Sequence, residues 1–190
     1  MNMKPIIIAI IALFLITLLY IINVIHNKVL IDKPTITLTT LSENDTNVAD
    51  TIKNIISREG KVNKSTADNY TRWIIDSATK YNLNPFLILS MIFVESRFDS
   101  KAIGSSNATG LMQIIPSVHK TTSAALLNPQ KNIQIGTKII SEYLQMSKNT
   151  AEGLLRYNGS FSRAPVYAIK VLKHKIIFES EAFKQSTHML

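Results

Sequence analysis

The stretch NPFLILSMIFVES, residues 84–96, predicts a buried helix. Asn84 is a residue type that caps helices, and Pro85 is favoured at the first helical position. The positions that follow, up to Val94, carry apolar side chains with one serine among them. Residues of this kind are found mainly inside proteins. We therefore expect a helix near 85–97 with most of its surface in the core.

Glu95 is the one carboxylate in this apolar run. If the helix starts at Pro85, Glu95 lies in its last turn or two, beside Met91 and Ile92. Loss of hydration and the negative end of the helix dipole both favour the protonated acid. A carboxyl that stays protonated is a candidate general acid. The alternative is a glutamate that reaches solvent past Arg97 or pairs with a cation, and residues further along the chain decide between the two.

Helical spacing continues on both sides of this segment. Apolar residues recur every three or four positions in the stretches 48–56 and 70–81. After it, Asn128-Pro129 repeats the capping signal and predicts a helix near 129–146. Further helices are expected at 117–127, 150–156 and 164–178. The sequence contains no convincing sheet pattern and no internal repeat, so the expected fold class is mainly α.

The N-terminal part of the chain predicts a membrane anchor. Residues 6–25 contain no charged side chain, and about 20 helical residues span the roughly 30 Å of bilayer hydrocarbon. The segment lacks the small-residue cleavage site of a signal peptide. We therefore expect a transmembrane anchor with its flanks at 1–28, a polar tether at 29–47 with a brief strand near 35–39, and a folded domain at 48–190.

Charge and cysteine content narrow the classes of partner. The formal net charge is +8, and the chain has no cysteine, which excludes disulfides and thiolate metal sites. Without residues 1–33 the charge is still +6, from 18 Lys and Arg against 12 Asp and Glu. A basic surface attracts anionic polymers and lipids. The cations are scattered and form no nucleic-acid-binding motif, so we expect no nucleic-acid partner.

Four short motifs occur in order beyond the helix. They are Glu95-Ser96, the tetrapeptide Gly110–Gln113, the series from Asn132-Ile133 through Gly136 to Tyr143-Leu144, and Tyr157-Asn158. The first follows the apolar run, and the second follows a small, polar loop. With these motifs, residues 66–177 resemble the soluble lytic transglycosylase family, which has a goose-lysozyme-like catalytic domain. The chain departs from the family pattern at Arg156, where an alanine is usual.

The resemblance implies a lysozyme-like helical domain that cleaves peptidoglycan glycan strands without a metal or cofactor. Glu95 would protonate the bond between N-acetylmuramic acid and N-acetylglucosamine and then deprotonate the muramic C6 hydroxyl, which leaves a 1,6-anhydro end. Tyr157 would hold Glu95 through its hydroxyl. The residues implied to bind substrate are Ser96, Met112, Gln113, Tyr157 and Asn158.

Two alternatives remain open at this point. Asp99 lies four residues after Glu95 and could act as a second carboxylate, which would make the protein a hydrolytic muramidase. A wall-binding scaffold that has lost catalysis is the other. The resemblance and the predicted anchor together imply a single-pass protein of the inner membrane with its domain on the wall side, or a protein of the internal membrane of a phage virion.

Overall fold

The computed structural model describes residues 38–159 and 165–187. The predicted membrane-spanning segment at 6–25 lies outside these residues. Within them, none of the helices has the length and apolar composition needed to cross a bilayer. The chain divides into two compact units, Met1–Ser42 and Glu43–Leu190, and the second contains every residue of the site described below.

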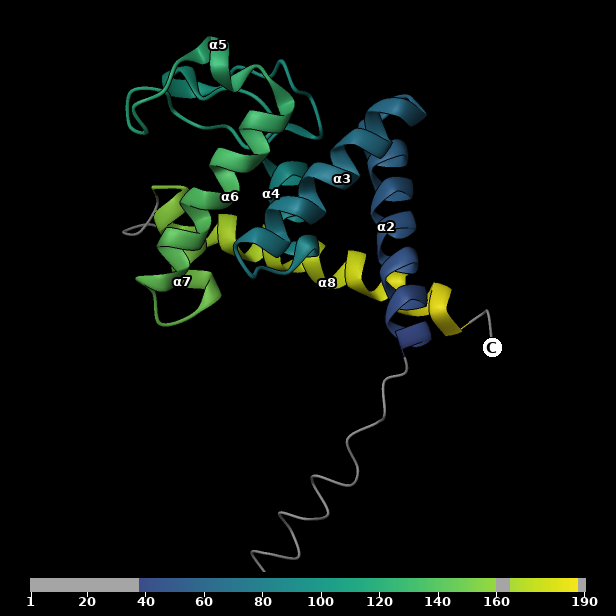
Figure 1. Ribbon diagram of the computed structural model, residues 1–190. Helices are drawn as coiled ribbons and strands as arrows, with labels where there is room; N and C mark the ends of the chain where they lie inside the picture. Colours follow the sequence, from purple (N-terminus) through teal and green to yellow (C-terminus); the bar gives the residue numbers. More distant parts are fainter. Residues whose placement is uncertain (1–37, 160–164, 188–190) are drawn as a thin grey trace, which may run out of the picture. The chain divides into compact units, whose positions relative to one another are not determined.

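The described residues are mainly helical, as expected, and contain no strand, only isolated bridges that link Thr109 to Ile103 and to Ile114. Figure 1 shows the helices in chain order. Their bounds are α2 (Leu38–Gly60), α3 (Lys64–Lys80), α4 (Pro85–Ser96), the short 3₁₀ helix η1 (Ser105–Asn107), α5 (Ser123–Leu126), α6 (Pro129–Gln145), α7 (Thr150–Tyr157) and α8 (Val166–Thr187).

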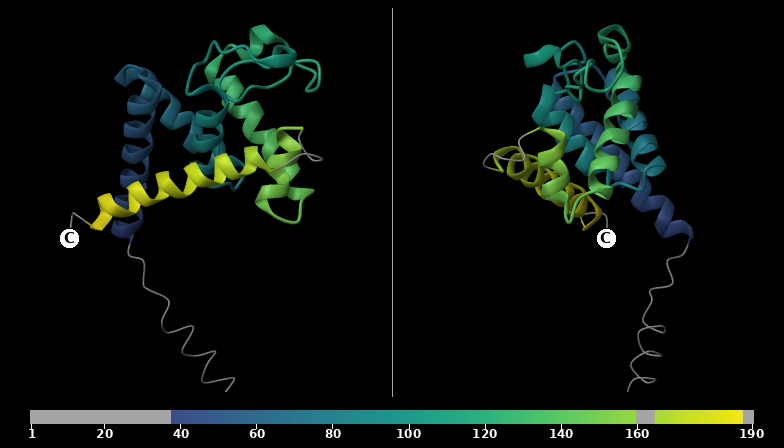
Figure 2. Two further views of the ribbon diagram at one scale, coloured as in Figure 1. Left: turned by 180° about the vertical axis from the view of Figure 1, so that it is seen from behind. Right: turned by 90° about the vertical axis from the view of Figure 1, so that its left-hand side faces the viewer.

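Helix α4 forms the centre of the core, as its sequence predicts. Every residue from Phe86 to Phe93 is buried. The Asn84 side chain accepts a hydrogen bond from the Phe86 amide at 2.8 Å, which satisfies one free donor of the first turn. Helices α3 and α8 pack against α4, and the long α8 runs across the domain in the left-hand view of Figure 2. The end of α4 is therefore enclosed by other helices.

The predicted helices at 129–146 and 150–156 are confirmed as α6 and α7. The helix expected at 164–178 is α8, which continues to Thr187. The helix expected at 117–127 is wrong for most of its length, because only Ser123–Leu126 is helical. Lys120 has a positive φ of 50°, and Thr122 caps α5 by accepting from the Ala125 amide at 3.2 Å. Turns therefore replace the first half of that helix.

The polar stretch before Val48 also differs from expectation. Helix α2 begins at Leu38, so the brief strand expected near 35–39 is wrong for residues 38 and 39, and residues 38–47 of the predicted tether are helical. Leu38, Leu41, Val48 and Ile52 stand three, seven and four residues apart. In the sequence these are the spacings of one helical face.

Candidate active site

Glu95 lies in the last turn of α4, where the chain changes direction abruptly. Arg97 and Phe98 follow with φ values of 51° and 67°, and the Arg97 amide donates to the Phe93 carbonyl at 3.1 Å. Two successive left-handed residues end the helix and lead the chain away from it. The Phe98 side chain is buried and contacts Phe93, which stabilises this turn. The backbone at Glu95 is therefore held by helix α4 before it and by the turn at Arg97 and Phe98 after it.

The surroundings of Glu95 favour its protonated form. Burial raises the pKa of this carboxyl from 4.5 to about 7, and interaction with the Tyr167 hydroxyl opposes part of the rise. Desolvation penalises the carboxylate, whereas a hydroxyl donor stabilises it. No other carboxylate of the described residues contributes to this pKa. Glu95 therefore has a pKa that lets it donate a proton near neutral pH and hold a negative charge afterwards.

Tyr167 is a site residue that the sequence motifs do not mark. It stands near the start of α8 and is 9% exposed. Its pKa is raised well above 10 by burial and by the nearby Glu95 carboxyl. The hydroxyl lies close to Glu95, yet it has no partner of good hydrogen-bond geometry among the described residues. A small movement of either side chain would complete the bond, so Tyr167 can respond to the charge on Glu95.

Tyr157 takes a different position from the one that the resemblance implies. Its hydroxyl donates to the main-chain carbonyl of Met112 at 2.8 Å and forms no hydrogen bond with Glu95. It still lies near enough that the Glu95 charge, together with burial, raises the tyrosine pKa. Tyr157 therefore positions the backbone at Met112, and Tyr167 is the tyrosine whose hydroxyl influences the Glu95 pKa most directly. Asn158 follows at the end of α7 and is exposed.

Met112, which the resemblance places among the substrate-binding residues, has a completely buried side chain. It packs against Gly136 of α6, where an added Cβ would lie 2.4 Å from the Met112 sulfur. This contact requires glycine at position 136. Met112 therefore supports the site from within the core.

Ser96 and Gln113 use their polar groups on the loop that follows α4. The Ser96 hydroxyl lies 2.8 Å from the Leu111 carbonyl and 3.2 Å from the Ile92 carbonyl. The Gln113 amide donates to the carbonyls of Ala102 and Gly110, at 3.1 and 3.0 Å. Ser96 therefore fixes the loop to the helix, and Gln113 ties parts of the loop to one another. Neither side chain forms a hydrogen bond with Glu95 within the described residues.

Asn132 joins the same loop to α6 and is completely buried. Its side-chain oxygen accepts from the Met112 amide at 2.8 Å, and its NH₂ group donates to the carbonyls of Thr109 and Leu126 at 2.8 and 2.9 Å. Sequence reasoning places Asn132 in a family motif without assigning it this role. A polar residue inside an otherwise apolar helix face is the signal that identifies it, because such a side chain must find partners.

Asp99 does not share the Glu95 site. It is exposed, and its carboxylate accepts a hydrogen bond from the Lys101 amide at 2.8 Å. That bond stabilises the turn after α4. The arrangement brings together one half-buried glutamate and two tyrosines, from α4, α7 and α8. Such a site can protonate a leaving oxygen and take a proton back.

The fold and the site define a mainly helical domain with one carboxyl that can donate and accept a proton. Comparison with known families agrees with this description. The family model described as "Transglycosylase SLT domain" matches residues 72–168, about half of the chain. The chain belongs to this family. The match includes Glu95, Asn132, Tyr157 and Tyr167.

Among curated relatives, the chain is 36% identical over 107 residues to "Membrane-bound lytic murein transglycosylase E" of Buchnera aphidicola subsp. Acyrthosiphon pisum (strain APS), a match that covers 50% of this chain and 48% of the relative. It is 33% identical over 95 residues to "Membrane-bound lytic murein transglycosylase C" of Actinobacillus pleuropneumoniae serotype 5b (strain L20), covering 42% and 26%. It is 28% identical over 89 residues to "Transglycosylase" of Enterobacteria phage PRD1, covering 46% and 34%. The chain thus spans half or less of the length of each relative.

Proposed function

We propose that this protein is a peptidoglycan lytic transglycosylase in which Glu95 is the catalytic acid and base. The observation that carries the proposal is the half-buried Glu95 at the end of α4, the carboxyl of which has its pKa raised to about 7 by desolvation. The names of the relatives support the substrate, since each is a transglycosylase and two are described as acting on murein.

The reaction needs one carboxyl that acts twice. Protonated Glu95 gives its proton to the oxygen between N-acetylmuramic acid and N-acetylglucosamine, and the bond from muramic C1 to that oxygen breaks. The C6 hydroxyl of the same muramic residue then bonds to C1, while the Glu95 carboxylate takes its proton. The enzyme is restored and the product carries a 1,6-anhydro ring. An intramolecular hydroxyl has a large effective concentration relative to water, so no second carboxylate is required.

Mass spectrometry of muropeptides released from purified peptidoglycan tests the proposal. The expected products end in 1,6-anhydro-N-acetylmuramic acid, which is one water lighter than a hydrolysed reducing end. Glu95→Gln should release none, because the amide has the shape of the acid without its proton. Reducing ends, together with a loss of activity in Asp99→Asn, would instead establish a hydrolytic muramidase. Binding to peptidoglycan without any product would establish an inactive scaffold.

We also propose that residues 6–25 anchor the enzyme in a membrane and that the domain acts on the wall side of it. The charge-free run and its length support this proposal. In fractionated cells the full chain should stay with the inner membrane after a carbonate wash, whereas a chain that begins at residue 34 should be released. Recovery of the full chain in the soluble fraction would contradict the anchor.

A further inference from the structure

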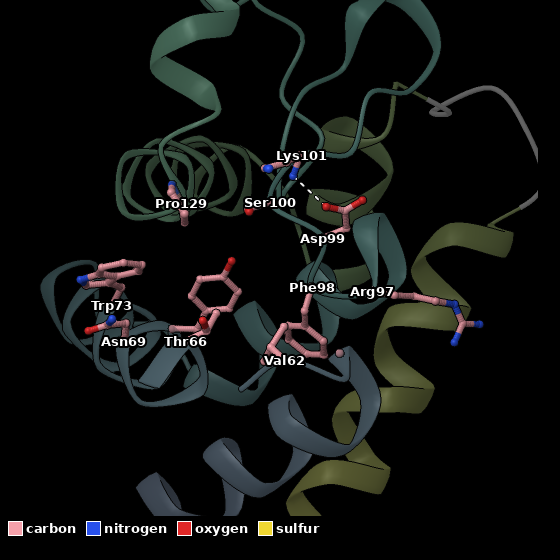
Figure 3. A pocket seen from close by; sticks show the side chains of 12 residues that line it. Val62, Thr66, Asn69, Trp73, Arg97, Phe98, Asp99, Ser100, Lys101 and Pro129 are labelled. Carbon is pink, nitrogen blue, oxygen red and sulfur yellow. Dashed lines mark hydrogen bonds between the residues drawn. The ribbon is translucent and has the colours of Figure 1, made fainter. Parts of the chain in front are cut away.

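A cavity of about 540 Å³ opens beside the end of α4, and its lining does not include Glu95, Tyr157 or Tyr167. Its walls come from α3 and from the loop that follows α4, with Pro129 at the start of α6. Figure 3 shows these walls, with the Arg97 side chain pointing away from the other labelled residues. The cavity is therefore separate from the candidate active site although it lies only a few residues from it in the chain.

The α3 wall provides an aromatic surface. Tyr70 and Trp73 lie almost one turn apart on this helix, and their ring centroids are 5.9 Å apart. Tyr70 is buried, whereas Trp73 is half-buried, so the indole presents part of its surface to the cavity. A large aromatic surface of this kind is suited to stacking against an apolar face of a ligand.

The remaining walls provide mixed hydrogen-bonding groups. Thr66 and Asn69 stand on α3, and Ser100 and Lys101 come from the loop after α4. The Asn69 side-chain oxygen accepts from Arg72 at 2.7 Å, so its NH₂ group is the part that a ligand would meet. Asp99 and Lys101 bring opposite charges to the rim. Arg97 also lines the cavity, but its side chain points away from the other labelled residues in Figure 3. The charges that remain at the rim, one of each sign, favour a neutral, polar ligand.

A pyranose ring meets these requirements, because one face presents C–H bonds and its rim carries hydroxyl groups. We propose that the cavity is a second carbohydrate site, which takes an N-acetylhexosamine unit of a glycan strand stacked on Trp73 with its amide and hydroxyl groups near Asn69 and Lys101. The ligand class rests on the proposed function, in which such strands are the substrate. A sugar held there would keep the enzyme on the wall between cleavage events.

Trp73 is the only tryptophan of the chain and therefore reports on this cavity alone. Purified full-length protein in detergent should be titrated with N-acetylglucosamine trimer while tryptophan emission is recorded. We expect a saturable change in emission with a dissociation constant of about 1 mM, as for a weak single-sugar contact. An emission spectrum that does not change up to about 20 mM trimer would overturn the proposal.

Two asparagine variants locate the sugar. Asn69→Ala keeps the Trp73 reporter and removes one ligand donor, so the dissociation constant should rise about five- to tenfold. Asn54→Ala changes an exposed asparagine of α2 outside the cavity and should leave it unchanged. Equal constants for the two variants would show that the sugar does not bind in the cavity.

The same samples separate this inference from the proposed function. If anhydro products form at the normal rate while Trp73 emission does not respond to trimer, only the second site is overturned. If Trp73 responds and Asn69→Ala weakens the response, but no product forms from peptidoglycan, only the proposed activity is overturned. If Asn69→Ala folds poorly, Trp73→Phe is the second variant, since it keeps an aromatic ring at this position. Its binding to purified peptidoglycan is then compared with that of the wild type by sedimentation.

Discussion

Glu95 combines a position at the negative end of a helix with burial, and both features raise the cost of its ionisation. The chain accepts this cost at a half-buried position, where an uncharged amide would be more stable at neutral pH. A residue that lowers stability and is surrounded by two tyrosines is expected at a catalytic position.

The first prediction concerns stability against pH. The folded pKa of Glu95 is about 7 and its ordinary value is 4.5, so the unfolded chain releases this proton first as pH rises. The contribution of Glu95 to stability should therefore fall between pH 4.5 and 7 by up to roughly 3 kcal/mol and stay constant above that range. The Glu95→Gln variant should not show this fall in stability, because its amide does not ionise.

Urea unfolding of wild type and Glu95→Gln at pH 4.5, 6 and 8 measures it. The two proteins should have similar free energies of unfolding at the lowest pH, and the variant should become the more stable one at pH 8. A variant that is less stable at every pH would show that Glu95 forms a structural interaction. In the wild type, kcat/KM should fall as pH rises above about 7, since the acid is then deprotonated.

Tyr167 carries the second prediction. Its hydroxyl lowers the pKa of Glu95, so Tyr167→Phe should raise that pKa and move the alkaline fall of kcat/KM to higher pH. We expect a tenfold or larger loss of kcat at pH 6, with a change in stability below about 1 kcal/mol because the hydroxyl has no well-formed hydrogen bond in the described residues. Tyr81→Phe, at the end of α3, is the control and should change neither quantity.

Sequence reasoning located Glu95 because a carboxylate stands out in an apolar run. It did not locate Tyr167, since a tyrosine on the inner face of a helix has the same pattern as a core residue. It also assigned Gln113 to the substrate, whereas the loop uses that amide for its own carbonyls. Only the folded loop shows which carbonyls need a donor, so the sequence carries no sign of it.

At the scale of elements, the site depends on how the loop after α4 is held between α4 and α6. Ser96 fixes its middle to α4, Asn132 fixes the same region to α6, and Gly136 lets Met112 approach the helix. These contacts involve backbone groups on both sides of Leu111 and Met112. These contacts hold the loop in place, and the loop is therefore a structural part of the site.

The third prediction tests this arrangement. Asn132→Ala removes three buried hydrogen bonds and leaves the Met112 amide and the Leu126 carbonyl without one, while the Thr109 carbonyl keeps its bond from the Ile114 amide. Since each unsatisfied buried group costs about 1–3 kcal/mol, the free energy of unfolding should fall by about 3 kcal/mol or more. Gln134→Ala changes an exposed residue of the same helix and should alter it by less than about 0.5 kcal/mol. Equal effects of the two changes in urea unfolding would contradict the role of Asn132.

The elements themselves were predictable to different extents. The starts of α4 and α6 were found because Asn-Pro specifies a cap and a first turn. The stretch 117–122 was misread as helix because its composition does not reveal the left-handed residue at Lys120. A turn of this kind depends on contacts made by the whole loop.

At the scale of the molecule, the net charge of +8 affects how the enzyme reaches an anionic wall. The fourth prediction is that binding of Glu95→Gln to purified peptidoglycan weakens several-fold when salt rises from about 0.1 M to about 1 M, because the screening length falls from about 10 Å to about 3 Å. Sedimentation of the wall with bound protein measures it. Binding that is independent of salt would assign the attraction to the sugar contacts alone.

The contact between α4 and α8 also bears on when the site can be completed during synthesis. Ribosomes make the chain from its N-terminus, so Glu95 leaves the ribosome more than seventy residues before Tyr167. Until α8 has been made, the chain lacks both the helix that packs against α4 and the hydroxyl beside the Glu95 carboxyl. A fragment that ends before position 166 would therefore contain Glu95 and the four sequence motifs without a complete site.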